Sequence, residues 1–198
     1  MTVQCIDVGL HGMRMCLFTL IYSCLALAVM GCDDVDTTPN PKQSSEGSLV
    51  RSFGWSTTAL PQDPSNDHWS DHVRCGEDDH GAELLADIWA YSIQTGDCNW
   101  LTIEQPSLRA VHEGDIIRAE VWHFFLSAPE PATARVGLAT ADGILVEMME
   151  PIPQPARLIE LEFKVQTYIA QDTPMYFHIS NHGTNSWHLL NIQVNPQE

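Results

Sequence analysis

The chain has 198 residues, which is room for one ordinary domain with an additional segment at one end. Its composition, 44% hydrophobic, 8% aromatic and 18% charged, is typical of a globular protein and argues against a mostly disordered one. The net charge of -17, from 9 Lys and Arg against 26 Asp and Glu, argues against nucleic acid as a partner, because an acidic surface repels phosphate.

An uncharged apolar run covers residues 15–30, directly after Arg14. It is shorter than the roughly 20 residues that a membrane-spanning helix needs. A short apolar run that follows a cation and ends in small residues is typical of a cleaved export signal. The sequence therefore predicts a signal peptide over residues 1–31. Three start residues are open: Met1, Met13 and Met15.

The end of this leader resembles the lipobox of bacterial lipoproteins. Val29, Met30 and Gly31 precede Cys32, so an aliphatic residue lies three positions before the expected cleavage and a small residue directly before it. The resemblance implies that Cys32 carries a diacylglycerol and further acyl chains such as palmitate, which together make a stable membrane anchor. We then expect the protein in the bacterial cell envelope, at the inner or outer membrane, facing the periplasm or the cell surface. An ordinary signal peptide, or a buried apolar helix with an incidental cysteine, is the alternative.

Residues 32–50 are rich in Ser, Thr, Pro and Asp and hold few side chains that could build a core. Such a segment cannot bury enough apolar surface to order itself. We predict a lipidated cysteine followed by a flexible acidic linker over 32–50, and a folded domain over 51–198.

Two cysteines remain once the leader and its lipid site are set aside, Cys75 and Cys98. An even pair in an exported chain favours a disulfide, because the compartment is oxidising. A metal site that joins Cys75 to His72 or His80 is the alternative, but no C-x-x-C or repeated spacing supports it.

The acidic stretch around Cys75 also holds His68 and His72, at a spacing that would align both rings on one helical turn. Clustered carboxylates suit calcium, yet a solvated acidic loop is the commoner origin of such a pattern. We therefore expect no cofactor; calcium or a transition metal is compatible with the sequence but not indicated by it.

Short segments in which apolar and polar residues alternate fill the rest of the chain. The clearest covers residues 158–169, where the period of two is that of a strand with one wet face. Asp142 and Gly143 between two other segments are a strong hairpin signal. The strands at 88–93 and 100–104 have weaker patterns, and residues 82–90 could instead form one or two helical turns. The eight predicted strands are 88–93, 100–104, 115–126, 132–140, 144–149, 158–169, 175–180 and 187–194.

About eight short strands, with no amphipathic helix pattern between them, predict an all-β fold: an antiparallel β-sandwich, with a jelly-roll as the expected topology. Two segments also resemble the galactose-binding-like jelly-roll of carbohydrate-binding modules. One is 114–123, which begins with Gly-Asp, and the other is 178–192, which carries Asn185 and Trp187 in a turn before the last strand. The chain also resembles small lipoproteins of myxobacteria. The resemblance supports the fold more than the function.

Aromatic rings are the usual stacking surface for a sugar ring, and Asn or His side chains bond its hydroxyls. Core packing is the alternative for each such residue, because Trp and Tyr in strands are often buried. The predicted glycan-binding residues are Trp122, Tyr176, His178, Asn185 and Trp187.

Three histidines, His178, His182 and His188, surround a predicted turn, and imidazole is a common ligand of zinc and copper. Alternation places His178 on the solvent side of its strand and His188 on the same side as Ile192 and Val194. The three rings then need not converge. A metal-handling lipoprotein is thus the second hypothesis for the function, and an envelope protein–protein adaptor is the third.

The sequence contains no catalytic motif: His112-Glu113 does not continue as a zinc-peptidase motif, and no G-x-S-x-G elbow or phosphate loop is present. We therefore expect a binding module rather than an enzyme. Its expected partners are a membrane, through the lipid anchor, and a glycan or an envelope protein.

Overall fold

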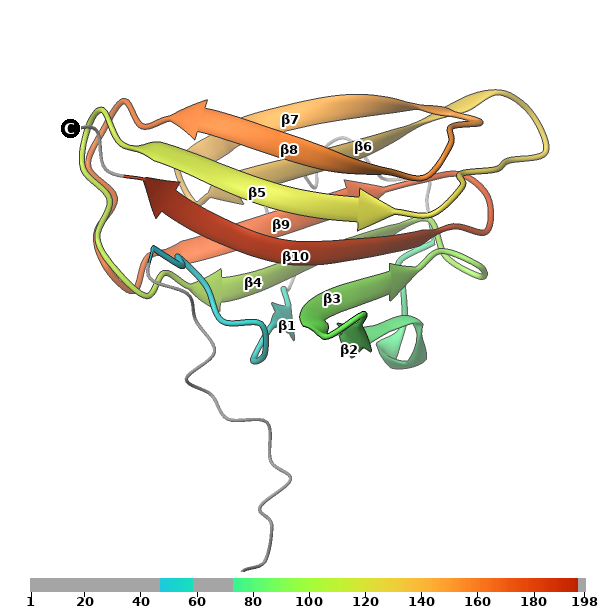
Figure 1. Ribbon diagram of the computed structural model, residues 1–198, viewed down its shortest axis with the longest axis horizontal. Coiled ribbons are helices and arrows are strands. Elements are labelled where there is room, and N and C mark those ends of the chain that lie inside the picture. The colour runs from blue at the N-terminus through green and yellow to red at the C-terminus, as the bar shows by residue number, and fades with distance from the viewer. Residues whose placement is uncertain (1–46, 59–72, 196–198) are drawn as a thin grey trace, which may run out of the picture. The chain divides into compact units, whose positions relative to one another are not determined.

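The computed structural model describes residues 47–58 and 73–195, which form two antiparallel five-stranded sheets packed face to face (Figure 1). The predicted signal peptide, Cys32 and the pair His68 and His72 lie outside the described residues. The strands within the described residues are β1 (Ser56–Thr57), β2 (His80–Leu85), β3 (Ile88–Gln94), β4 (Trp100–Pro106), β5 (Ile116–His123), β6 (Ala132–Thr140), β7 (Gly143–Ile152), β8 (Arg157–Lys164), β9 (Pro174–Ser180) and β10 (Ser186–Asn195).

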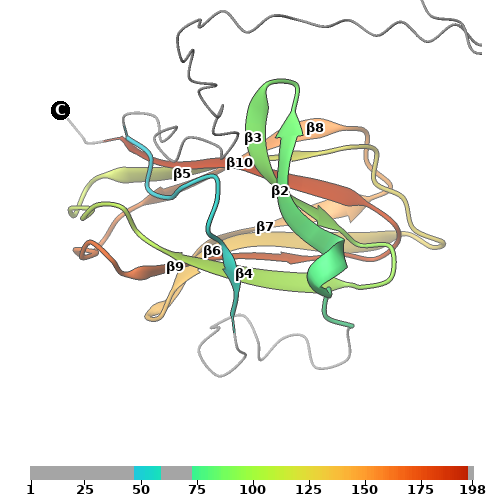
Figure 2. The same ribbon diagram turned by 90° about the horizontal axis from the view of Figure 1, so that it is seen from below.

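Sheet A has the strand order β2-β3-β10-β5-β8, and sheet B has the order β1-β4-β9-β6-β7. Figure 2 shows the two layers one above the other. The chain passes repeatedly from one sheet to the other, so the predicted antiparallel β-sandwich is confirmed. The single described helix is η3 (Glu77–Asp79), and no described helix is long and apolar enough to cross a membrane.

Alternating residue types place one side of each strand in the core. In β5, Ile117, Ala119 and Val121 are fully buried, while Arg118 and Glu120 between them are partly exposed on the outer face of sheet A. Every second side chain of a strand points the same way, so this pattern directs one apolar row toward sheet B.

The structure resolves the ambiguity at residues 82–90 in favour of a hairpin. Ala86 and Asp87 have positive φ values of 47° and 72°, which is the backbone that a two-residue hairpin turn requires. The segment before this turn, β2, is therefore an additional edge strand that the sequence did not predict.

Three predicted strands differ from the observed ones by four residues in length, and the other five differ by at most two. The strand expected over 158–169 is β8 and ends at Lys164; beyond it, Ile169 pairs with Val111 across a loop. β5 ends at His123, earlier than the expected residue 126. β7 continues through Pro151, which an edge strand of sheet B tolerates because its outer backbone groups have no partner strand.

Residues 47–58, which we call the strap, join the two sheets. Leu49 N donates to Ile192 O at 2.7 Å and Val194 N donates to Gly47 O at 2.8 Å, so the strap begins as an addition to sheet A beside β10. It ends as β1 at the edge of sheet B, and Figure 2 shows it in cyan between the layers. Leu49 is fully buried, so the folded domain includes residues 47–50, which the sequence placed in the linker.

The predicted disulfide between Cys75 and Cys98 is present, with Cα atoms 4.9 Å apart. Asp79 places a carboxylate oxygen within 4.8 Å of both sulfur atoms, but the disulfide uses the two thiols that a metal would need. His80 does not join them: its Nδ1 forms a 2.7 Å hydrogen bond with the Tyr91 hydroxyl. The disulfide therefore leaves no thiol for the alternative metal site of Cys75 with His80, and His72 lies outside the described residues.

Candidate functional site

The five predicted glycan-binding residues lie on different surfaces of the sandwich. Trp122 is partly exposed on the outer face of sheet A, whereas Tyr176 and His178 are buried on β9 in sheet B. Trp187 is fully buried between the sheets, and Asn185 is buried in the turn before β10. The structure thus does not bring the five residues together in one cleft.

His178 is 3% exposed, so its expected place on a solvent-facing side is wrong. Its Nδ1 forms a 2.7 Å hydrogen bond with the Thr102 hydroxyl on the neighbouring strand. The ring of Trp100 lies 6.3 Å away. These contacts with β4 hold the buried imidazole in place within sheet B.

Asn185 acts as a bridge between two loops. Its Oδ1 accepts a hydrogen bond from Ser127 N at 2.7 Å, and its Nδ2 donates to Ser127 O at 3.1 Å and to Asn181 Oδ1 at 3.0 Å. Gly183 in the same turn has a φ of 91°, and a Cβ there would lie 2.1 Å from Ser127 O. The turn therefore needs glycine and Asn185 for its own shape.

The three histidines proposed as metal ligands do not converge. His178 lies on β9 in sheet B, His188 lies on β10 in sheet A, and His182 is exposed in the turn between these strands. Among residues 47–58 and 73–195, the disulfide region is the only place where three candidate ligand atoms gather. The described structure does not favour the metal hypothesis.

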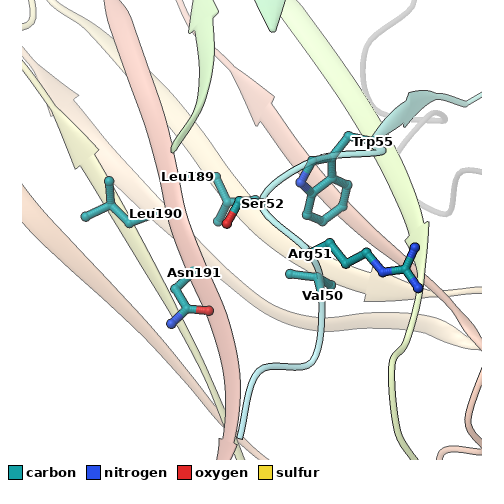
Figure 3. Close-up of a pocket in the computed structure, with 7 residues that line it drawn as sticks. All are labelled: Val50, Arg51, Ser52, Trp55, Leu189, Leu190 and Asn191. Carbon is teal, nitrogen blue, oxygen red and sulfur yellow. The ribbon is translucent and has the colours of Figure 1, made fainter. Parts of the chain in front are cut away.

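A groove runs between the strap and β10, and Figure 3 shows the residues on its two sides. An adjoining hollow of about 210 Å³ extends it to the β2–β3 hairpin. We call the two together the strap groove. Its lining residues are Ser48, Val50, Arg51, Ser52 and Trp55 of the strap, Asp87, Ile88 and Trp89 of the hairpin, and Leu189, Leu190 and Asn191 of β10.

A β-bulge in β10 gives the groove its shape. The register between β10 and β5 shifts between Leu189 and Asn191. Leu189 is buried toward the core, whereas Leu190 and Asn191 lie on the opposite side of the strand (Figure 3). The extra residue reverses the alternation, so the prediction that His188 shares a face with Ile192 is wrong.

Four aromatic rings gather beside the groove, two from the strap and two from β3. Phe53 and Trp89 have ring centroids 4.7 Å apart with planes at 64°, and Trp55 and Tyr91 have centroids 6.2 Å apart at 60°. Edge-to-face contacts of this kind fix ring orientations. Trp55 and Trp89 are partly exposed, so they present oriented rings before any ligand arrives.

Hydrogen-bonding groups from three segments surround these rings. The buried Gln105 fixes the backbone of Arg51: its Oε1 accepts from Arg51 N at 2.6 Å and its Nε2 donates to Arg51 O at 3.0 Å. Asn191 on β10 accepts a 3.4 Å hydrogen bond from the Ser48 hydroxyl, and Asp87 lies at the hairpin turn. The groove therefore combines oriented indole rings with an amide, a carboxylate and a guanidinium.

Sequence reasoning missed Trp55 and Trp89. Trp55 follows the expected linker closely, and Trp89 lies in the segment that fitted either a strand or a helix. Asp87 is the only carboxylate among the lining residues, whereas glycoside hydrolysis commonly uses two. The groove has the chemistry of a binding site.

No protein-family model matches the sequence, and the search of curated proteins finds no match. Among solved structures, a non-crystalline cellulose-specific carbohydrate-binding module has 12% identity and a TM-score of 0.49, over 78% of this chain and 95% of its own. The N-terminal cellulose-binding domain of Cellulomonas fimi β-1,4-glucanase C has 12% identity and a TM-score of 0.38, over 62% of this chain and 91% of its own. An arabinose-bound α-L-arabinofuranosidase has 10% identity and a TM-score of 0.47, over 75% of this chain. The match spans only 26% of the arabinofuranosidase.

Proposed function

We propose that this protein is an exported lipoprotein, anchored to a membrane of the bacterial cell envelope through Cys32, whose β-sandwich binds a glycan without cleaving it. The anchor rests on the leader sequence that ends in Gly31-Cys32. Glycan binding rests on one observation, the two oriented and partly exposed tryptophans of the strap groove, Trp55 and Trp89.

The chemistry of a sugar matches this arrangement. A pyranose ring has an apolar C–H face that stacks on an indole, and hydroxyls around its edge that bond to polar side chains. Trp89 would supply the stacking surface, while Asp87 and Asn191 would bond the hydroxyls. The hollow of about 210 Å³ is smaller than the roughly 300–1,000 Å³ of sites for drug-sized ligands, so we expect it to hold one sugar unit.

We expect the Trp89→Ala variant to bind the glycan about tenfold to a hundredfold more weakly than the native chain, because it loses a central aromatic contact. A glycan array identifies the ligand, and isothermal titration calorimetry measures the dissociation constant. Asn191→Ala removes a hydrogen-bonding group from the opposite wall, so it should weaken binding as well.

Tyr168→Ala is the matched control, because Tyr168 is an aromatic residue that is 60% exposed outside the groove, where it contacts His112. It should bind like the native chain. Circular dichroism shows whether each variant is folded. Native affinity in folded Trp89→Ala, or no glycan bound by the native chain, would contradict the proposal.

The anchor has a separate test. We expect Cys32→Ser to abolish incorporation of labelled fatty acid and to release the protein from the membrane fraction, because no other cysteine occupies the lipobox position. Cys24→Ser, a change within the same leader, should keep both properties. Continued labelling of the Cys32→Ser chain would contradict the anchor.

A further inference from the structure

The outer face of sheet A carries a second cluster of aromatic and polar side chains next to the strap groove. Trp122 of β5 and His188 of β10 lie opposite each other in register, Phe124 follows β5, and Glu83 lies on β2. We call these four residues the Trp122 patch; none of them lines the strap groove. We propose that the patch is a second binding site, whose ligand carries an ammonium group on an amino sugar or an alkylamine.

His188 is the first observation. It belongs to the outer face, yet it is 1% exposed, with the ring of Phe124 edge-on at 5.3 Å. Neither ring nitrogen has a hydrogen-bond partner among the described residues. Buried polar groups are nearly always hydrogen-bonded, so an unbonded imidazole beneath an exposed ring indicates a missing partner.

Glu83 is the second observation. Its Oε2 lies 3.8 Å from His188 Nδ1, which is too long for a direct hydrogen bond. Burial lowers the pKa of His188 and the Glu83 carboxylate opposes that shift, so the ring is neutral at pH 7. No Lys or Arg among the described residues forms an ion pair with Glu83, so the half-exposed carboxylate has only this neutral ring beside it.

The rings of Trp122 and Phe124 are the third observation. Their centroids are 6.3 Å apart and their planes meet at 89°, so they form a corner. Trp122 is partly exposed and Phe124 is 47% exposed. The face of an aromatic ring attracts a cation within about 6 Å of its centroid, and substituted ammonium groups are bound in this way.

The surrounding charge favours a cation over a neutral ligand. Glu120 of β5 and Glu160 of β8 lie directly opposite each other, an arrangement that destabilises a sheet because like charges repel. Arg118 in the next pair bonds Glu162 and also interacts with Glu120 and Glu160, so three carboxylates share one cation. A positive ligand beside Trp122 would relieve the repulsion, whereas a neutral sugar would not.

The ammonium group would donate hydrogen bonds to Glu83 and to the free nitrogen of His188, while its carbon skeleton lies against Trp122. No covalent step is involved. The patch would therefore select a ligand by its charge, independently of glycan binding in the strap groove.

The test titrates the full chain with a glucosamine trisaccharide, its N-acetylated counterpart, a glucose trisaccharide and butylamine, and follows tryptophan fluorescence. We expect the glucosamine trisaccharide or butylamine to bind at least tenfold more tightly than both neutral sugars. Tight binding of butylamine assigns the patch to alkylamines, and binding of glucosamine alone assigns it to amino sugars. Equal affinity for the charged and neutral trisaccharides, together with no binding of butylamine, would overturn the proposal.

Two substitutions locate the binding. Glu83→Gln keeps the shape and removes the charge, so it should weaken amine binding at least tenfold; Glu113→Gln, at an exposed residue outside the patch, should not. Native amine affinity in Glu83→Gln would overturn the proposal. Trp89→Ala, which alters the strap groove alone, should leave amine binding intact, so the two proposals succeed or fail separately.

Discussion

Replacement of Trp187 by alanine is expected to lower the free energy of unfolding by about 3–5 kcal/mol, the usual cost of removing a large buried aromatic side chain. Trp187 is fully buried, with an exposed fraction of 0%. It lies opposite Ile93 of β3 and His123 of β5. The His123 ring centroid is 4.9 Å from its own. In a domain of this size the loss corresponds to a drop in Tm of about 6–20 °C.

Urea denaturation of the Trp187→Ala and Trp187→Phe variants measures this cost. The phenylalanine variant should lose less, because it fills most of the same volume. The sequence also predicted Trp187 as a glycan contact, and the experiment separates the two roles. A variant with native stability but without glycan binding would show that the residue contacts the ligand.

The second large effect is expected at Glu150, a fully buried carboxylate on β7. Arg157 of β8 donates hydrogen bonds to both of its oxygens, and His123 Nε2 lies 3.6 Å from Oε1. Arg157→Ala would leave a buried charge without its cation. We expect a loss of about 2 kcal/mol, less than the 3–5 kcal/mol for a fully buried pair, because the Arg157 side chain is 45% exposed.

This pair also predicts how stability depends on pH. Burial by itself raises the pKa of Glu150, but hydrogen bonds from Arg157 and Gln154 outweigh it and hold the pKa below its usual value of 4.5. The ionised carboxylate therefore binds its proton less readily in the folded state than in the unfolded one. Its stabilisation is complete above pH 4.5 and is lost as the pH falls through the lowered folded-state pKa.

Urea denaturation at pH 7 and at several values between pH 5 and pH 3 measures both effects. The native chain should lose stability on acidification more steeply than Glu150→Gln, whose side chain does not titrate. Arg118→Ala is the matched control: the Arg118–Glu162 pair is exposed on both sides, so its loss should leave the unfolding transition unchanged. Equal destabilisation by Arg157→Ala and Arg118→Ala would contradict the claim that the buried Glu150 makes its ion pair the more stabilising one.

The sequence predicts most strands because their two faces meet different environments. Burial alternates throughout β5, and apolar and polar residues alternate from Ile117 to Val121, since one side faces sheet B and the other faces water. β2 gives no such signal, because its residues are exposed or partly exposed on both sides of an edge strand. β1 has two residues, too few for any periodicity.

The candidate site was harder to predict, for two physical reasons. Trp55 and Trp89 come from the strap and the hairpin, and only tertiary packing brings them to the same groove. Leu190 adds a residue to β10, and a bulge of this kind reverses every later inward or outward assignment in the strand. Trp122, Tyr176 and Trp187 are all aromatic, but the sequence alone does not tell which sheet each belongs to.

The pairing of Gly47 with Val194 determines how far the Trp122 patch lies from the two ends of the described domain. It places the first and last described residues of the domain at one corner, where Asn195 also pairs with Ile116 at the start of β5. Trp122 lies six residues further along β5, about 20 Å away at roughly 3.3 Å per residue. If the domain is attached at that corner, the rigid strand β5 holds the Trp122 patch about 20 Å from the point of attachment.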